Sequence, residues 1–344
     1  MNLPGLQSKR DLFNGAMHAV GLTRVWRRSD LRQLTVLGYH RIKPDHDWHT
    51  AFEPDVYGPT AAVFRGQMEW LKRYAHVVSE GDVINHLDGK CALPPNAVLV
   101  TFDDGYVDNY TLALPILKQL GMPAVFFVPT GLIDKRELGW WDVVAFMLQR
   151  SGRQFVAIRG RYFNLRSPAE RLTAISFVQR LIKLTPYEQT KAIIDELSVV
   201  TGVERPSAES QSAELMTWEQ LKDAANHGVT TASHCVTHRV LATLSAEEQA
   251  RELFDSRRVL AERLGMQVRT VAYPVGGTQH FTPETEKLAA AAGYEAAFSF
   301  ESGINGAEIV NRWAIRRIAA PLTVAGMAAQ IAWAKAAPMR QELT

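Results

Sequence analysis

The sequence predicts an α/β fold with a parallel sheet, best described as a single α/β barrel that carries an insertion. Short apolar, β-prone runs alternate with segments of helical periodicity, which is the pattern of strands joined by crossover helices. The chain has 344 residues, long for an ordinary domain but compatible with one such barrel. Its composition, 47% hydrophobic and 22% charged, is typical of a globular protein with a sizeable core.

Six segments are predicted to be strands because each is short, apolar and β-prone. They cover residues 35–39, 97–102, 124–128, 229–233, 270–273 and 296–300. Helical periodicity predicts helices between them, for example over residues 64–74, 111–120, 217–226 and 246–264. Glycines follow four helix-like segments where a C-terminal cap is expected, at Gly121, Gly228, Gly265 and Gly293.

The alternation of strands and helices stops between about residues 143 and 211. We interpret this segment as a mainly helical insertion into the barrel rather than an independent domain. In chain order it is predicted to hold a hairpin around Gly160, two helices and a polar loop, over residues 154–165, 168–184, 186–200 and 204–213. The barrel domain as a whole is expected to span residues 31–335.

Residues 1–30 are predicted to form a separate amphipathic segment with basic flanks. Its apolar residues recur at helical spacing, as Phe13, Ala16, Met17 and Val20 show. We expect this helix to pack on its own domain, although a basic amphipathic helix can also lie on an anionic membrane surface. No stretch approaches the roughly 20 apolar residues of a spanning helix, and no secretory signal is evident. The expected location is cytoplasmic, with peripheral contact at the inner membrane face as the alternative.

Charge and cysteine content exclude some classes of protein. The formal net charge of +2 argues against a nucleic-acid binder that depends on a basic field. Cys91 and Cys235 are the two cysteines of the chain. Two cysteines do not form a disulfide framework, so nothing indicates an oxidising compartment.

Polar side chains come directly after several predicted strands. His40, Asp103, Asp104 and His234 each follow such a strand, and Tyr273 ends another. In parallel α/β folds, ligands bind at the carboxyl ends of the strands, so these residues are expected to gather at one rim. The sequence therefore predicts a functional site assembled from distant parts of the chain.

The residue types at this rim indicate a metal site. One carboxylate and two imidazoles can hold a divalent ion with open coordination positions, and a spare carboxylate can move protons beside it. His234 and His238 would share a face if a helix or turn begins at His234. Asp103 and Asp104 could simply begin a turn before Gly105. The metal site is favoured because charge at the end of a buried strand is expensive unless it is used.

Other polar and aromatic residues near the rim have two readings. His40 is equally compatible with a structural histidine and with a proton donor, since imidazole titrates near neutral pH. Trp141, Asp142 and Tyr273 lie in or beside the predicted rim loops. Aromatic rings there could stack on a ligand such as a sugar, and core packing explains them equally well.

Together these motifs resemble those of the NodB-type polysaccharide deacetylases, carbohydrate esterase family 4. Residues 101–105, Thr-Phe-Asp-Asp-Gly, resemble the first motif of that family, and residues 234–238 resemble its second motif, H-[ST]-x-x-H. Residues 272–276 resemble the third motif. The similarity covers about residues 35–318, interrupted by the insertion. It implies the deformed (β/α) barrel of that family and an enzyme that deacetylates glycans.

The chain also departs from the family pattern. Cys235 stands where Ser or Thr is usual, and Ala272 occupies the apparent place of an arginine that orients the catalytic aspartate. Arg312, Arg316 or Arg317 could substitute for it. The pair Tyr39-His40 near the N-terminus resembles the rearranged order of the branch that deacetylates poly-N-acetylglucosamine, which favours His40 as general acid.

The resemblance implies a role for each candidate residue. Asp104, His234 and His238 would hold a divalent ion, taken to be Zn²⁺, with Asp103 as general base and His40 as general acid. A backbone N–H near Tyr106 would help to hold the oxyanion. Candidate substrate-binding residues are Tyr106, Trp141, Asp142, Tyr273 and Arg317.

The expected substrate is an N-acetylated glycan, either a polysaccharide, an oligosaccharide or a lipid-linked precursor in bacterial glycan biosynthesis. No nucleic-acid partner is expected, and the oligomeric state is not predicted. One alternative is removal of O-acetyl or formyl groups from a glycan. The other is a catalytically inactive sugar-binding scaffold, which Ala272 would support.

Overall fold

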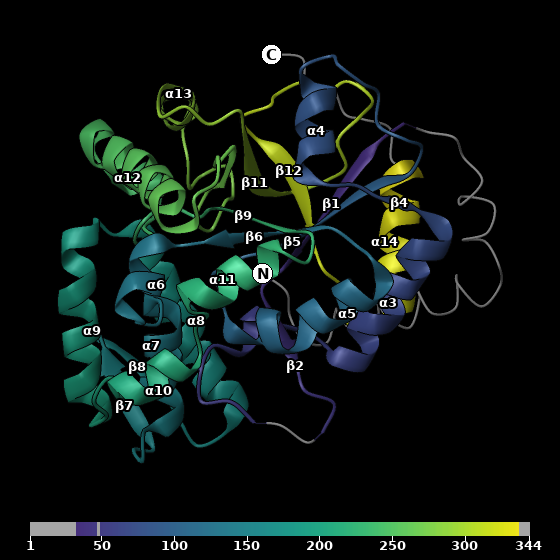
Figure 1. Ribbon diagram of the computed structural model, residues 1–344. Helices are drawn as coiled ribbons and strands as arrows, with labels where there is room; N and C mark the ends of the chain where they lie inside the picture. Colours follow the sequence, from purple (N-terminus) through teal and green to yellow (C-terminus); the bar gives the residue numbers. More distant parts are fainter. Residues whose placement is uncertain (1–31, 47–48, 337–344) are drawn as a thin grey trace.

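The computed structural model describes residues 32–46 and 49–336, so the segment expected over residues 1–30 lies outside the described residues. A parallel sheet forms its centre (Figure 1). Its strands are β1 (Leu34–Tyr39), β4 (His76–Val77), β5 (Ala97–Phe102), β6 (Ala124–Val128), β9 (Val229–Ser233), β10 (Thr270–Ala272), β11 (Ala296–Ser302) and β12 (Ile315–Ala319).

The strand order closes the sheet into a barrel. Within the described residues the order is β1-β12-β11-β10-β9-β6-β5-β4, every pairing is parallel, and β1 also pairs with β5. The β1–β5 pairing completes a ring of seven strands and leaves β4 outside it. This arrangement confirms the predicted α/β barrel of the deformed (β/α) type.

The six predicted strands are all present, with differences of one or two residues at the ends of β1, β10 and β11. The sequence prediction missed β12, whose residues are Ile-Arg-Arg-Ile-Ala. Two adjacent arginines lower the apolar content below that of a typical buried strand, so periodicity alone does not reveal it. Arg317 is nevertheless buried, because a partner elsewhere in the chain compensates its charge.

Helices surround the barrel (Figure 1). They are α3 (Ala61–Tyr74), α4 (Glu80–Leu87), α5 (Leu114–Leu120), α6 (Thr130–Lys135), α11 (Trp218–Ala225), α12 (Ala246–Leu264), α13 (Pro283–Ala291) and α14 (Val324–Ala336), with short η1 (Pro54–Val56), η2 (Asn109–Ala113) and η3 (Leu241–Thr243). The helix predicted over 111–120 divides into η2, a π-helical turn, and α5. Gly121 and Gly265 cap α5 and α12 in the left-handed conformation, as predicted.

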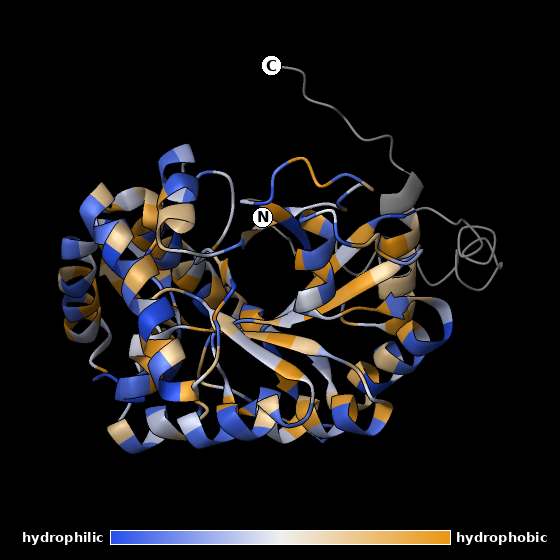
Figure 2. Cartoon of the chain, turned by 45° about the horizontal axis from the view of Figure 1, so that its top comes forward, coloured by the Kyte–Doolittle hydropathy of each residue, from blue (hydrophilic) through white to orange (hydrophobic). Residues whose placement is uncertain are grey.

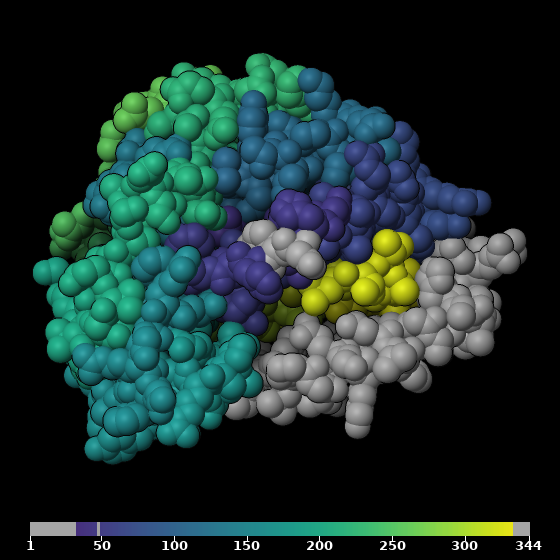
Figure 3. Space-filling view, turned by 90° about the horizontal axis from the view of Figure 1, so that it is seen from below, coloured from purple at the N-terminus to yellow at the C-terminus, as the bar shows by residue number. Residues whose placement is uncertain are grey.

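The segment interpreted as an insertion contains α7 (Trp140–Arg150), β7 (Phe155–Ile158), β8 (Arg161–Asn164), α8 (Pro168–Leu184), α9 (Tyr187–Thr201) and α10 (Ala208–Ala213). It buries an apolar cluster of its own, to which Leu148, Val178 and Leu197 belong. Figure 3 shows the segment, in teal, at one side of the molecule. The polar loop predicted over 204–213 is wrong in part, because the Ser207 hydroxyl accepts a hydrogen bond from Ser210 N and starts α10.

Two apolar clusters hold the barrel together. One includes Val36, Leu99 and Phe298 from alternate strand positions, and the other joins the opposite strand faces to the helices. Figure 2 shows orange and pale strands at the centre and mixed blue and orange helices around them. Two short strands, β2 (Arg41–Lys43) and β3 (Tyr57–Thr60), pair beside the barrel. Within the described residues, every helix lacks the length and apolarity needed to span a membrane.

Candidate metal centre and catalytic rim

The three predicted ligands converge after the carboxyl ends of β5 and β9. One ligand atom from each of Asp104, His234 and His238 lies within 4.8 Å of the other two, and all three residues are buried. The Asp104 Oδ1 atom is 3.3 Å from Nε2 of His238 and 3.6 Å from Nε2 of His234. Two imidazole nitrogens thus face one carboxylate oxygen across a small gap.

The backbone around these ligands is unusual. Asp104 has a φ of 72°, Cys235 of 64° and His238 of 57°, and non-glycine residues in this region cluster at functional sites. A bend therefore joins His234 and His238 rather than a helix. Glu252 on α12 holds this bend, because its Oε2 accepts hydrogen bonds from Val236 N at 2.8 Å and Thr237 N at 2.9 Å.

The protonation states suit a cation between these side chains. Burial lowers the pKa of His234 to about 4, which keeps the imidazole neutral and able to coordinate. Its Nδ1 lies 2.7 Å from the Ala272 carbonyl oxygen and, as the N–H donor, leaves Nε2 facing the carboxylate. Burial raises the pKa of Asp104, but the nearby histidines outweigh it and the pKa lies below the usual range.

The side chains of Asp104, His234 and His238 suit a bound metal ion. Asp104 Oδ1 is buried without a hydrogen-bond partner among the described residues, and a buried acceptor of this kind is costly unless something satisfies it. A carboxylate and two imidazoles are common ligands of Zn²⁺. The residues present therefore fit a divalent ion that joins Asp104, His234 and His238.

Asp103 is held by an arginine. Arg317 Nη1 donates a hydrogen bond of 2.7 Å to Asp103 Oδ1, and its Nε donates to the Ser299 carbonyl oxygen at 2.8 Å. Burial raises the pKa of Asp103, but Arg317, then His234 and His40, outweigh it and the pKa stays below its usual value. The other oxygen, Oδ2, is 3.9 Å from His234 Nε2 and 4.0 Å from His40 Nε2.

The position of Arg317 distinguishes it from Arg312 and Arg316, the other two arginines considered as partners of Asp103. Arg312 forms an ion pair with Asp88 at 2.9 Å, and Arg316 is exposed while Arg317 is buried. The Arg317 side chain is covered on one side by the Phe300 ring, 4.6 Å from its guanidinium carbon. Arg317 thus contacts Asp103 rather than the solvent-facing part of the site.

Three candidate substrate-binding residues form a buried hydrogen-bonded chain. Trp141 Nε1 donates to the Tyr106 hydroxyl at 2.7 Å, and that hydroxyl donates to Asp142 Oδ2 at 2.6 Å. The Trp141 ring packs on His238 with 4.3 Å between ring centroids. Burial raises the pKa of Asp142 to about 6. Through Trp141 these three hydrogen-bonded side chains pack against His238, a contact that sequence reasoning did not anticipate.

Tyr273 lies in the core. Its side chain is fully buried and packs on Phe281 with 4.8 Å between ring centroids. The ring offers no exposed face for stacking on a ligand. His40 differs from these residues, because its side chain is 28% exposed beside Asp103.

Comparisons with known proteins point to one family. The family model described as polysaccharide deacetylase matches residues 90–157 and 180–297, more than half of the chain. The Bacillus subtilis protein YxkH, named as a polysaccharide deacetylase, is 22% identical over 82% of this chain and 70% of its own length. The poly-β-1,6-N-acetyl-D-glucosamine N-deacetylase of Escherichia coli is 31% identical over 114 residues, only 32% of this chain and 16% of that protein.

Solved structures show the same fold. The Streptococcus pyogenes deacetylase PplD, in complex with acetate, superposes with a TM-score of 0.58 and 19% identity over 88% of this chain and 99% of that chain. IcaB from Ammonifex degensii gives 0.53 and 20% over 88% of this chain and 97% of that chain. At these identities the likeness concerns the fold alone.

Proposed function

The chain belongs to the polysaccharide deacetylase family, and from this premise we propose that it removes N-acetyl groups from an N-acetylated sugar by metal-dependent hydrolysis. The observation that carries the proposal is the buried cluster of Asp104, His234 and His238 beside a second aspartate, Asp103, that an arginine holds ionised. The name of the Escherichia coli relative, an N-deacetylase, supports the choice of an N-acetyl group.

In this mechanism Asp104, His234 and His238 would hold a divalent ion, taken to be zinc. The bound ion would act as a Lewis acid that lowers the pKa of a water ligand toward ~7 and polarises the substrate carbonyl. The chain keeps His234 neutral by burial and orients its ring through the Ala272 carbonyl. The packing of Trp141 on His238 restricts the second ring.

Asp103 acts as general base and accepts the proton of the attacking water. Arg317 keeps this carboxylate ionised and fixes its orientation, so that Oδ2 remains free to accept. His40, partly exposed and 4.0 Å from Oδ2, donates a proton to the leaving amine. The main-chain N–H of Tyr106 is proposed to stabilise the oxyanion, because backbone donors are pre-organised for that purpose. Acetate and a free amino sugar are the products.

The test is acetate release from N-acetylglucosamine oligomers by the purified protein, with and without a chelator. We expect chelation and Asp103→Asn to abolish release and His40→Ala to slow it by about 10²-fold or more. Full activity of metal-free protein or of Asp103→Asn would refute the mechanism. Normal turnover by His40→Ala would refute the acid role alone.

Removal of O-acetyl groups is the second candidate, because the same metal and base would serve it. A substrate panel separates the two activities if it contains N-acetylated, O-acetylated and lipid-linked sugars. The reading as an inactive scaffold depended on Ala272, and the contact of Arg317 with Asp103 removes that support.

A further inference from the structure

A cavity of about 360 Å³ lies around Arg41, the residue after His40. Its lining includes Arg41, Thr50, Phe52, Phe146, Ser210 and Glu214, and it contains none of the proposed metal ligands nor Asp103. We propose that this cavity, the Arg41 pocket, binds one uncharged pyranose unit of a glycan. Its volume is at the small end of ligand sites, which suits a single sugar ring.

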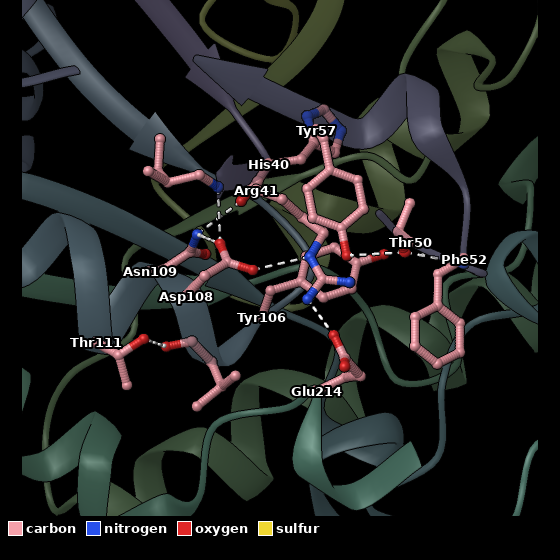
Figure 4. A network of polar contacts seen from close by, with 12 residues as sticks. His40, Arg41, Thr50, Phe52, Tyr57, Tyr106, Asp108, Asn109, Thr111 and Glu214 are labelled. Atoms are coloured by element: carbon pink, nitrogen blue, oxygen red, sulfur yellow. Dashed lines mark hydrogen bonds and ion pairs between the residues drawn. The ribbon is translucent and has the colours of Figure 1, made fainter. Parts of the chain in front are cut away.

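Arg41 provides a fixed hydrogen-bond donor for such a ligand. It is 3% exposed, its Nε donates to Asp108 Oδ2 at 2.8 Å, and its Nη2 donates to Glu214. The guanidinium carbon lies 4.3 Å from the ring centres of both Tyr57 and Tyr106. The third nitrogen, Nη1, is buried without a partner in the described structure. Figure 4 shows it on the side of Thr50 and Phe52.

The rest of the lining offers flat apolar surface and hydroxyl groups. Phe52 and Phe146 stack with 5.8 Å between ring centroids and 23° between ring planes. Thr50 and Ser210 add hydroxyls on the same cavity. A pyranose ring has one apolar face that packs on aromatic rings, and its hydroxyls both donate and accept hydrogen bonds. An acceptor on the sugar would satisfy Arg41 Nη1.

The charges around the pocket favour an uncharged ligand. The lining holds two guanidinium groups, of Arg41 and Arg150, two carboxylates, of Asp108 and Glu214, and the imidazole of His49. Both carboxylates are already paired with Arg41. An anionic ligand would meet these carboxylates, and a cationic ligand would compete with Arg41 for them. The formal charges of the two guanidinium groups and the two carboxylates cancel, so the lining offers a charged ligand no net opposite charge, and removing such a ligand from water is costly.

The pocket is connected to the proposed catalytic residues by short contacts. Asn109 Nδ2 donates to the His40 carbonyl oxygen at 2.7 Å, and Asp108 Oδ1 accepts from Ile42 N at 2.8 Å. The Tyr106 ring covers Arg41 from the side opposite Tyr57 in the stack drawn in Figure 4. The inference rests on the proposed function and deepens it, because a glycan would then be recognised at a second unit besides the one that is deacetylated.

The test measures binding of an N-acetylglucosamine tetramer to the full chain by titration calorimetry and ligand-observed NMR. The background variant is Asp103→Asn, so that the ligand is not turned over. Ser210→Trp fills the pocket, and Ala208→Trp places the same side chain on the exposed part of the same helix. We expect Ser210→Trp to bind about tenfold more weakly or to lose one binding event, with Ala208→Trp unchanged.

Equal binding by the two tryptophan variants overturns the proposal. If Ser210→Trp does not fold, as judged by thermal unfolding, Phe146→Leu removes a flat ring face and must show the same loss. A glucose tetramer should bind the pocket and a galacturonate tetramer should not, so a preference for the anionic sugar also overturns it. Acetate release by the protein with Asp103 intact is measured separately. Its absence on every acylated glycan refutes the proposed function, whereas equal binding refutes the pocket alone.

Discussion

Arg317 supplies Asp103 with a charge partner from the opposite end of the chain. A buried carboxylate without such a partner would take up a proton, and a protonated Asp103 could not act as a base. The guanidinium gives one N–H to Asp103 and another to the Ser299 carbonyl oxygen, so the position of the carboxylate is fixed as well as its charge. Lysine carries the charge but not this planar geometry.

Arg317→Lys should therefore lower kcat by about 10–10² while the protein still folds. The pKa of Asp103 should rise toward its usual value, because the ion pair is weaker. Since Asp103 must be ionised to act as the proposed base, the acid limb of the pH–rate profile should move to higher pH. Arg312→Lys, which alters the ion pair with Asp88, is the matched control and should behave as wild type. An unshifted acid limb in Arg317→Lys would contradict this assignment.

A second prediction at the residue scale concerns Glu53, which is 3% exposed. Burial raises its pKa from 4.5 to about 7, so the folded state holds a proton that the unfolded chain has released. Stability from this group is present at low pH and is lost as the pH rises from 4.5 to about 7. Glu53→Gln removes that loss, which amounts to at most ~3 kcal/mol.

The free energy of unfolding of Glu53→Gln should thus exceed that of the wild type by more at pH 8 than at pH 4.5. Urea denaturation at the two values measures it. Asp142 also has a raised pKa but is common to both proteins and largely cancels. Glu188→Gln on the exposed surface is the control. A difference independent of pH would show that Glu53 is ionised in the fold.

At the scale of elements, the strand ends explain what the sequence could predict. Asp103, Asp104, His234 and His40 follow strands whose apolar pattern is plain, so their common edge follows from topology. Arg317 could not be selected because β12 has too few apolar residues to be recognised as a strand. Its burial depends on Asp103, 214 positions away. No local pattern in the sequence predicts a contact between residues so far apart in the chain.

The loop after β10 contains a glycine, Gly276, that has no room for a side chain. Gly276 has a φ of 67°, and a Cβ there would lie 2.6 Å from Phe300 N. Phe300 N also donates a hydrogen bond of 2.7 Å to Gly276 O. The Phe300 ring contacts Arg317 and its centroid lies 5.4 Å from that of the His40 ring, so a displaced Phe300 would disturb the candidate site.

Gly276→Ala should destabilise the protein by about 3 kcal/mol or more and reduce acetate release. Gly121→Ala is the matched control, since its φ of 66° is nearly the same but nothing lies within 4 Å of the added Cβ. It should cost only the ~1–2 kcal/mol of a left-handed alanine. Chemical denaturation of both variants measures the difference. Equal costs would mean that the loop adjusts freely.

At the scale of the whole molecule, closure of the barrel assembles the site. Strand β1 pairs with β5 and with β12, and this register sets Tyr39 opposite Phe102 and Gly38 opposite Ala319. His40 follows β1, Asp103 follows β5 and Arg317 lies in β12, so these pairings bring the three residues together, with Arg317 at Oδ1 of Asp103 and His40 at Oδ2. The proposed ligands come from β5 and the loop after β9, so the complete ligand set exists only in the folded chain.

A metal that binds only the folded chain must stabilise it as a whole. A free Zn²⁺ concentration one hundred times the dissociation constant should raise the free energy of unfolding by about 2.7 kcal/mol, less any binding to unfolded histidines. Chelation should reverse the shift, which a thermal or urea unfolding series measures without an activity assay. His238→Ala should lose most of the response, while His46→Ala, an exposed histidine outside the cluster, should keep it. If both variants respond like wild type, the ion binds elsewhere, and Asp104, His234 and His238 are not its ligands.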